Sequence, residues 1–302
     1  MIVVIGEILI DIFQDYERIG GAPFNFAFHL KKLGFPVRFF TRVGNDRHGK
    51  RIIDMLEKNG FDLADVQMDS RHSTGTVRVD LDQRGIPQFD IRANVAYDQL
   101  DLNIADVSGA DGADMIYFGT LLQRTDAACR QVQRFLSHIK KGARRFCDIN
   151  LRPPHVNPDA VAGSLRHADL LKVNEAELAD IQRAFDGPTE ENDVMPWLME
   201  TFTIGTVALT RGSRGSVIYS HDGPITSPTV PSSSIVDTVG AGDGYAAILA
   251  AGCMRQIPWA ETLRQASDFA ARICGIAGAV PDDDTFYNDF RRLPKGDPDG
   301  CE

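Results

Sequence analysis

The sequence lacks the basic clusters that nucleic-acid-binding proteins carry. Its 302 residues include 32 Lys and Arg against 42 Asp and Glu, which gives a formal net charge of −10. Affinity for a nucleic-acid backbone comes from clustered Lys and Arg that neutralise phosphates. We therefore expect no nucleic acid among the partners. Small anionic ligands are a separate matter, because a few backbone amides can bind them locally.

Signals for secretion or membrane insertion are also missing. The apolar start, residues 1–13, has no basic region and is interrupted by Glu7 and Asp11, so it predicts a buried strand and not a signal peptide. The longest weakly polar stretch, residues 245–254, is about half of the roughly 20 residues that a membrane span needs. We expect no membrane segment.

Cysteine is sparse and irregularly spaced. The five cysteines are odd in number and show no C-x-x-C pattern. This spacing favours reduced thiols in a cytoplasm over a disulfide framework or a zinc site. The sequence therefore predicts a cytoplasmic protein.

Strand patterns alternate with helix patterns along most of the chain. Short β-branched or aromatic runs predict strands at residues 2–5, 37–43, 115–118, 145–149, 169–173, 206–210 and 216–219. Helical spacing predicts helices at residues 24–33, 50–59, 126–141, 175–185 and 244–254. Such alternation predicts a mostly parallel sheet with helices on both faces. Residues 74–92 instead predict a hairpin, inserted as a flap.

The strongest chemical signal is the segment DTVGAGDG at residues 237–244, which precedes an apolar helix. Small residues at a helix start let backbone N–H groups converge on an anion such as a phosphate. Asp243 would repel a resting phosphate there, but it could take the proton of a hydroxyl that attacks phosphorus. The alternative is that Asp243 only caps the helix.

Several segments together resemble the ribokinase-like (PfkB) sugar kinases. The segment 237–243 resembles the C-terminal signature of this family, and GGAPFN at residues 20–25 resembles the N-terminal one. Further matches, in the order of the family, are Gly6-Glu7, Asp11, Gly34, Val43-Gly44-Asn45-Asp46, Asp148-Ile149-Asn150-Leu151-Arg152, Asn174-Glu175-Ala176-Glu177 and Thr210-Arg211-Gly212-Ser213-Arg214-Gly215. The resemblance covers residues from about 6 to 281.

The resemblance implies an α/β fold with a doubly wound, mostly parallel sheet flanked by helices and a small β-strand lid over a sugar. We expect one kinase domain over residues 1–302, with the lid inserted from about 12–20 and 73–98. The implied reaction moves the γ-phosphoryl group of ATP to a sugar hydroxyl. Lids of this kind often pair between subunits, so a homodimer through the lid is a further expectation.

By resemblance, Asp243 is the catalytic base. The amides of Gly240, Ala241 and Gly242 would stabilise the charge that develops on the transferred group. In part of the family, the residue at Asp237 helps to form a monovalent cation site, for instance for K⁺.

The predicted metal and nucleotide residues follow from the same resemblance. Asn174 and Glu177 would help to place Mg²⁺ with ATP, with Glu177 acting through water. Their alternative role is a helix start, because Asn174 is a good cap and Glu177 lies three positions on. The predicted nucleotide site further includes Thr210, Gly212, Gly215 and Asp268, the last at a position where Asn or His is expected beside the adenine.

The predicted sugar site combines Asp11 with the first signature. A carboxylate at the end of an apolar strand faces the ligand crevice at the carboxyl edge of a parallel sheet. Asp11 can accept two hydrogen bonds from sugar hydroxyls, and Asn25 can donate and accept. Gly20 and Gly21 would let the backbone approach the sugar. Two arginines are weaker candidates for the rim of the site: Arg92 and Arg152.

Within the family, the sequence most resembles bacterial fructokinases, through GEILIDIF, GGAPFN, residues 94–98 and DINLRPP. Ribokinase and 2-keto-3-deoxygluconate kinase are the close alternatives. Leu9 replaces an Asn that ribokinases tend to carry, whereas Arg152 would suit the carboxylate of a sugar acid. A nucleoside kinase and a non-catalytic sugar or nucleotide sensor on the same fold are the more distant alternatives.

Overall fold

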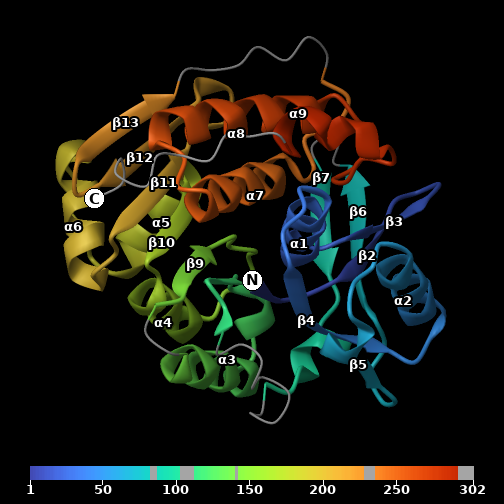
Figure 1. Cartoon of the computed structure of the whole chain (residues 1–302). Coiled ribbons are helices and arrows are strands. Elements are labelled where there is room, and N and C mark those ends of the chain that lie inside the picture. Colours follow the sequence, from blue (N-terminus) through green and yellow to red (C-terminus); the bar gives the residue numbers. More distant parts are fainter. Residues whose placement is uncertain (82–86, 103–111, 140–141, 228–234, 292–302) are drawn as a thin grey trace.

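The computed structural model describes residues 1–81, 87–102, 112–139, 142–227 and 235–291. Its centre is a nine-stranded sheet with the order β13-β12-β11-β10-β9-β8-β1-β4-β5 (Figure 1). The strands are β1 (Ile2–Ile5), β4 (Val37–Gly44), β5 (Val66–Asp69), β8 (Met115–Phe118), β9 (Arg144–Asp148), β10 (Leu170–Asn174), β11 (Thr206–Thr210), β12 (Ser216–Ser220) and β13 (Gly223–Ser227). The pairs from β5 to β11 are parallel, and β12 and β13 extend the sheet in antiparallel fashion.

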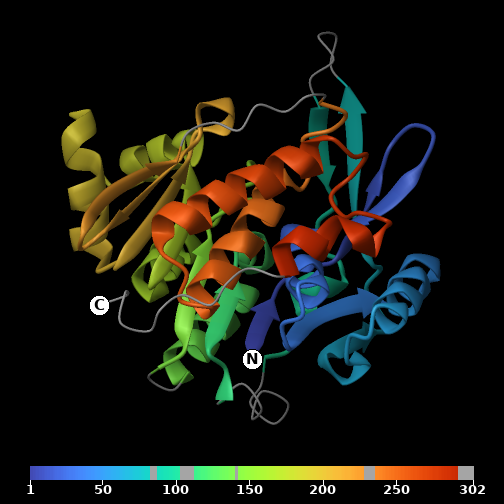
Figure 2. The same ribbon diagram turned by 45° about the horizontal axis from the view of Figure 1, so that its top comes forward.

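Apolar side chains fill both faces of the sheet, as strand β1 illustrates. Ile2 and Val4 belong to one buried cluster, and Val3 and Ile5 belong to another on the opposite face. The first cluster is covered by α1 (Ala22–Lys32), α2 (Arg47–Lys58), α7 (Ala241–Met254) and α8 (Trp259–Cys274), and the second by α3 (Asp126–His138), α4 (Pro158–His167), α5 (Glu175–Ala184) and α6 (Glu191–Phe202). Figure 2 shows α7 and α8 side by side across the first face. The predicted doubly wound fold is confirmed.

Most predicted elements are found, with small shifts at their ends. The seven predicted strands are each confirmed to within one residue. The helix predicted from residue 50 begins at Arg47, because Asp46 caps it by accepting a hydrogen bond from the Gly49 amide. The helix predicted over 126–141 is described up to His138, and residues 140–141 lie outside the described residues. Helices α4, α6 and α8 have no counterpart among the predicted ranges.

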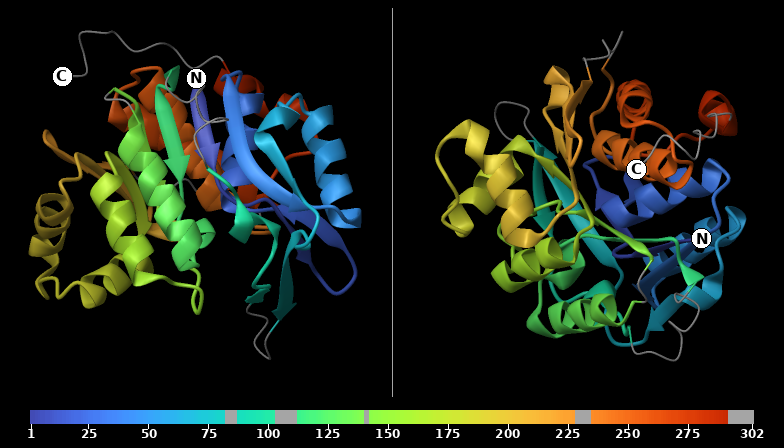
Figure 3. Two further views of the ribbon diagram at one scale, coloured as in Figure 1. Left: turned by 90° about the horizontal axis from the view of Figure 1, so that it is seen from below. Right: turned by 60° about the vertical axis from the view of Figure 1, so that its left-hand side comes forward.

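A separate four-stranded sheet lies beside the large one (Figures 1 and 3). Its strands, in spatial order, are β3 (Glu17–Gly20), β2 (Leu9–Ile12), β6 (Gly75–Leu81) and β7 (Pro87–Ile91). The predicted hairpin is confirmed as the β6–β7 pair, while its turn at residues 82–86 lies outside the described residues. We call this small sheet the lid.

The N-terminal segment corrects one prediction. It was expected as one buried strand, but β1 ends at Ile5 and the chain then enters the lid as β2. Asp11 therefore lies within a lid strand, paired with Arg18 on one side and Val77 on the other. The break falls at Gly6, where a Cβ atom would lie 2.2 Å from Cγ of Pro23, so α1 packs directly on the backbone of this turn.

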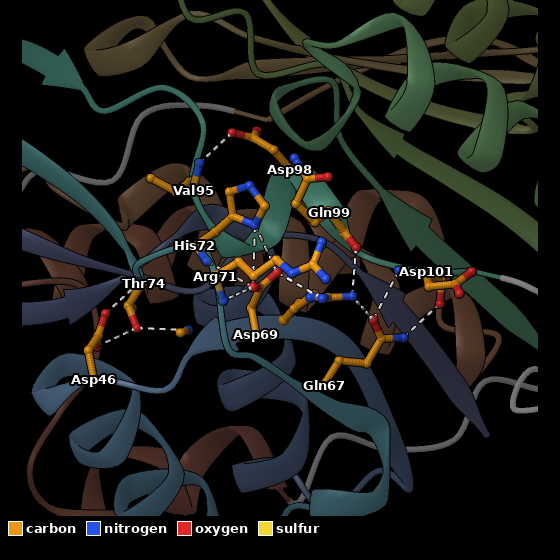
Figure 4. Close-up of polar contacts among 12 residues, drawn as sticks. Asp46, Gln67, Asp69, Arg71, His72, Thr74, Val95, Asp98, Gln99 and Asp101 are labelled. Carbon is orange, nitrogen blue, oxygen red and sulfur yellow. Dashed lines mark hydrogen bonds and ion pairs between the residues drawn. The ribbon is translucent and has the colours of Figure 1, made fainter.

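Two carboxylates, the partly buried Asp46 and the buried Asp69, fasten the segment that enters the lid (Figure 4). Asp46 accepts hydrogen bonds from both the amide and the hydroxyl of Thr74, each at 2.8 Å, while it also caps α2. Asp69 accepts from the amides of Arg71 and His72 at 2.7 and 2.8 Å and forms an ion pair with Arg42 at 2.8 Å. Burial alone would raise the pKa of Asp69, but these hydrogen bonds and the charge of Arg42 stabilise the carboxylate and lower the pKa to about 2.

Within the described parts of the chain, no helix combines the length and the apolar character that crossing a membrane requires.

Replacing Asp46 by Ala tests this anchor. The change removes the cap of α2 and leaves the buried amide of Thr74 without its partner, so we expect the free energy of unfolding to fall by about 2–4 kcal/mol. Urea denaturation followed by circular dichroism measures the loss. Asp54→Ala, on the exposed side of the same helix, is the matched control and should change stability by less than about 0.5 kcal/mol. Equal losses in the two variants would contradict the anchoring role.

Candidate active site

The glycine-rich segment forms the accessible start of a helix that is buried from Gly244 to Gly252. Helix α7 begins at Ala241, three residues earlier than predicted, so Asp243 lies in its first turn. Gly240 is the N-cap with φ of 77°, and a Cβ atom there would lie 2.3 Å from Cβ of Ala279, so only glycine fits. The first amides of a helix have no partner within it, and they make this end attractive to an anion.

Asp243 does not serve as the helix cap. No side chain caps α7. Instead, one carboxylate oxygen of Asp243 accepts a hydrogen bond of 2.7 Å from Nδ2 of Asn25, on α1. Burial raises the pKa of Asp243 above its ordinary value, while the Asn25 hydrogen bond acts to lower it. The other amide atom, Oδ1 of Asn25, is buried and finds no hydrogen-bond partner among the described residues.

Asp11 and Asp243 act on each other, although they come from the lid and from α7. Burial, followed by the charge of Asp243, raises the pKa of Asp11 to about 7. Gly20 lies opposite Leu9 on the neighbouring strand, and a Cβ atom there would come within 2.3 Å of Oδ2 of Asp11. Gly21, the next residue, is the N-cap of α1, and its carbonyl accepts a hydrogen bond of 2.9 Å from the backbone N–H of Asn25. The two signatures therefore meet at one place.

Arg152 is the cation that these carboxylates share. It follows β9, and its charge acts to lower the pKa of Asp11, Asp243 and the neighbouring Glu177. The predicted sugar-side residues Asp11, Asn25 and Arg152 are therefore brought together with Asp243.

A buried ion pair beneath the glycine segment was not predicted from the sequence. Nζ of Lys172, on β10, donates to both carboxylate oxygens of Asp148, on β9, at 2.9 and 3.0 Å. The hydroxyl of Tyr117 donates to the same carboxylate at 3.2 Å. Nζ also lies 3.6 Å from where a Cβ atom of Gly242 would be, and the charge of Lys172 acts to lower the pKa of Asp243. The charge of Asp148 acts on Asp243 in the opposite direction, so the ion pair as a whole leaves burial as the main influence on the pKa of Asp243. The available signal was a lysine inside the apolar run LLKVN.

Asn174 and Glu177 form the capping box that was their alternative role. The Asn174 side chain accepts from the Glu177 amide, and Oε2 of Glu177 accepts from the Asn174 amide, both at 2.9 Å. Oε1 of Glu177 also accepts from the amide of Leu151 at 3.1 Å. Thr210 is the cross-strand neighbour of Asn174 at the carboxyl end of β11. The loop after Thr210 includes Gly212 and Gly215 and closes through a hydrogen bond from the Arg211 amide to the Gly215 carbonyl.

Two further predicted residues, Asp237 and Asp268, lie at different distances from the site. Asp237 is close to the site, because its charge acts on Asp11, and its carboxylate accepts hydrogen bonds from the amides of Val239 and Gly278. Asp268 lies on α8, where it pairs with Arg272 at 3.1 Å. Within the described ranges, Asp268 forms no hydrogen bond or ion pair with another predicted site residue.

Arg92 lies apart from the Asp11 group. It lines a hollow of about 520 Å³ together with Thr76 and Arg78. Side chains alternate along a strand, and Val77, not Thr76 or Arg78, is paired with Asp11. The hollow that Arg92 lines is therefore on the opposite face of the lid from Asp11.

Comparisons with known proteins agree with this fold. A family model described as pfkB family carbohydrate kinase matches residues 1–285. The chain is 27% identical over 274 residues to a putative sugar kinase of Pyrococcus horikoshii (84% of this chain, 83% of the relative) and 28% identical over 314 residues to fructokinase-2 of Oryza sativa subsp. japonica (93% and 90%). Its fold is similar to a fructokinase structure with bound ATP from Xylella fastidiosa, with a TM-score of 0.80, 22% identity and coverage of 92% and 94%.

The Lys172–Asp148 pair can be tested through stability. Lys172→Met leaves the buried Asp148 carboxylate without its counter-ion, so we expect the free energy of unfolding to fall by about 3–5 kcal/mol. The double variant Lys172→Met/Asp148→Asn removes both charges and should recover most of that loss. Urea denaturation of both variants measures the difference. If the double variant is no more stable than the single one, the two charges do not depend on each other.

Proposed function

The chain belongs to the pfkB family of carbohydrate kinases, and on that premise we propose that it transfers the γ-phosphoryl group of ATP to a primary hydroxyl of a small sugar, with fructose as the favoured substrate. The observation that carries the proposal is the position of Asp243. It is a partly buried carboxylate at the positive end of α7, held by Asn25 and next to Asp11. A site that only binds phosphate gains nothing from a carboxylate there. A site that removes a proton next to phosphate requires one.

The proposed reaction uses the residues of the chain as follows. A carboxylate oxygen of Asp243 accepts the proton of the sugar hydroxyl, whose oxygen forms a new bond to the γ-phosphorus. The bond from that phosphorus to the bridging oxygen of ADP breaks, and ADP leaves with the electron pair. The amides of Gly240, Ala241 and Gly242, with the positive charge of Lys172 close by, stabilise the charge on the transferred group.

Mg²⁺ fits the residues on the nucleotide side as an ion held mainly by phosphate and water. Both carboxylate oxygens of Glu177 already accept backbone amides, which favours contact through water. The described residues contain no group of three or more His, Cys, Asp or Glu that could hold a metal ion alone. We propose that Glu177 and Asn174 orient this hydrated ion, which would neutralise phosphate charge. A K⁺ ion at Asp237 is a separate proposal that rests on the family resemblance, and both carboxylate oxygens of Asp237 already accept backbone amides.

We assign the remaining predicted residues to the two substrates. Thr210, Gly212 and Gly215 would face the ATP phosphates and ribose, since Thr210 adjoins Asn174. Asp268 would accept the adenine amine only after releasing Arg272.

On the sugar side, Asp11 and Asn25 would bind hydroxyls, with the backbone at Gly20 and Gly21 close to the sugar and Arg152 at the rim. Oδ1 of Asn25 is a buried acceptor that a sugar hydroxyl would satisfy.

Fructose is favoured because relatives named fructokinase span most of the chain. Ribose and 2-keto-3-deoxygluconate are the alternatives, the latter because Arg152 could pair with its carboxylate. A panel of these three sugars with adenosine and inosine, scored by ADP formation with Mg-ATP, decides among them. A sensor would bind a ligand without forming ADP, and a nucleoside kinase would act on adenosine or inosine.

We also propose that the chain forms a homodimer through the lid and works in the cytoplasm. The lid ends in two edge strands, β3 and β7, which could pair with a second copy. The proposed cytoplasmic location is supported by four cysteines that are free thiols in the structure, as expected in a reducing compartment. Sedimentation velocity of the purified protein tests the dimer.

Asp243→Asn tests the base directly. The amide keeps the size of the side chain but cannot take up the proton, so we expect kcat to fall by about 10²–10⁴-fold. The affinity for ATP, measured by calorimetry, should stay within about twofold. Asp54→Asn on exposed α2 is the matched control and should leave kcat unchanged. Near-normal turnover in Asp243→Asn would remove Asp243 from this role.

The pH dependence of kcat/KM tests the hydrogen bond between Asn25 and Asp243. The base must be deprotonated, so activity falls on the acid side as pH drops through the pKa of Asp243, which burial raises. The Asn25 hydrogen bond favours the charged carboxylate and holds this pKa down. Asn25→Ala should therefore move the acid limb to higher pH, in addition to raising KM for the sugar. An acid limb at the same pH in both proteins would contradict the assignment.

A further inference from the structure

Glu7 is a buried carboxylate that none of the roles above uses. It follows β1, and its exposed fraction is only 3%. Glu7 forms no ion pair within the described part of the chain. Burial raises the pKa of Glu7 to about 7, while a hydrogen bond with its own backbone and the charges of Arg152 and Arg124 act to lower it. A Cβ atom on Gly21 would lie 2.7 Å from the carbonyl oxygen of Glu7, so Glu7 adjoins the start of α1.

Arg124 comes from the connection after the neighbouring strand of the sheet, where it ends the 3₁₀ helix Leu121–Gln123. It follows β8, which pairs with β1, so both residues leave the carboxyl edge where ligands of open α/β sheets bind. Nε and Nη2 of Arg124 each donate to Asp98 at 2.7 Å, and Nη2 also donates to the carbonyl of Arg92. The guanidinium lies over the Tyr97 ring, 5.0 Å from its centroid.

Two buried polar atoms in this group remain without a partner. They are Nη1 of Arg124 and the hydroxyl of Tyr97, neither of which has a hydrogen-bond partner among the described residues. Tyr97 belongs to the same apolar cluster as Leu9 and Val77, the lid residues on the face of Asp11. Buried polar groups are normally satisfied, so unpartnered donors beside an unpaired carboxylate indicate a missing polar partner.

We propose that Glu7 is a further sugar-binding residue, supported by Tyr97 and Arg124, that accepts hydrogen bonds from hydroxyls away from the one that is phosphorylated. The assignment rests on the proposed function and deepens it. Arg124 does not need Glu7 as its counter-ion, because Asp98 already holds two of its nitrogens. Glu7 adjoins Gly21 at the start of α1, the helix whose Asn25 binds Asp243, so it lies on the proposed sugar side of the site.

This assignment also narrows the substrate class. Glu7 and Asp11 would place two carboxylates against the sugar, opposed by Arg152 and, at Glu7, by Arg124, which Asp98 already pairs. Carboxylates bind hydroxyls well and repel a carboxylate on the ligand. The site therefore favours a neutral polyhydroxy sugar and discriminates against a sugar acid.

Glu7→Gln tests both parts of the proposal. The variant keeps the shape of the side chain and loses its charge, so KM for fructose should rise about tenfold while kcat stays within about threefold. The ratio of kcat/KM for 2-keto-3-deoxygluconate to that for fructose should rise about tenfold. The melting temperature should stay equal or increase, since a buried, unpaired carboxylate is replaced by a neutral group. A carboxylate that served the fold would give the opposite change.

Two companion variants complete the test. Tyr97→Phe removes only a hydroxyl that has no internal partner, so the fold should be unaffected while KM for fructose rises several-fold. Asp65→Asn is the matched control, because Asp65 is a buried carboxylate whose partner Arg38 is remote from the site. It should lower stability and leave the substrate ratio unchanged.

Sugar binding without ATP, measured by calorimetry on wild type and variants, distinguishes a failure of the role of Glu7 from a failure of the proposed function. If the wild type phosphorylates sugar while Glu7→Gln and Tyr97→Phe bind it with unchanged affinity, the role of Glu7 is wrong and the proposed function stands. If the wild type neither binds nor phosphorylates any sugar of the panel, the proposed function is wrong and the role of Glu7 falls with it.

Discussion

The structure depends on one constraint, which is to keep a carboxylate charged at the positive end of a buried helix. Helix α7 is apolar on all sides and is packed between α1 and α8, so it cannot shift without exposing its core. Asp243 is thereby fixed, and Asn25 fixes its orientation from α1. Gly20 and Gly21 directly precede α1, so the packing of α1 against α7 also positions the proposed sugar site. Chemistry and core packing are carried by the same helices.

Crowding of carboxylates at this edge of the sheet has an energetic cost, which the cations only partly offset. Burial raises the pKa of Glu7 and Asp11 to about 7, so part of the stability of the chain is lost as pH rises and these groups become charged. Lys172 and Arg152 lower the cost at Asp243 without removing it. Neighbouring carboxyl groups whose pKa is raised by burial are a common feature of functional sites. The arrangement makes sense if a ligand with several hydroxyls completes it.

The sequence was most informative where one signal determines one structure. Short apolar runs identified the strands of the large sheet, and the small residues before α7 identified the helix start, because nothing else explains them. Residues 1–13 misled, because a mostly apolar stretch does not reveal a break such as the one at Gly6, which depends on contact with Pro23. The pairing of Lys172 with Asp148 depends on which strands become neighbours, so spacing alone could not show it. Helix α8 could have been found, since Leu263, Ala266, Phe269 and Ile273 recur at helical spacing.

The way the lid is attached limits how it can close. Asp46 and Asp69 hold the segment that enters it, Arg124 holds the segment that leaves it, and the Ala96 amide joins the two through the carbonyl of Ser73. Bending at either segment would leave buried carboxylates without their hydrogen bonds, which is costly. The strands of the lid are held as well, because β2 pairs with β6 along its length and Glu17 of β3 forms ion pairs with Arg47 and Arg51 of α2. Closure of the lid would therefore have to carry α2 with it or break these ion pairs. Since Asp11 lies on β2, the same movement would shift the proposed sugar-binding carboxylate.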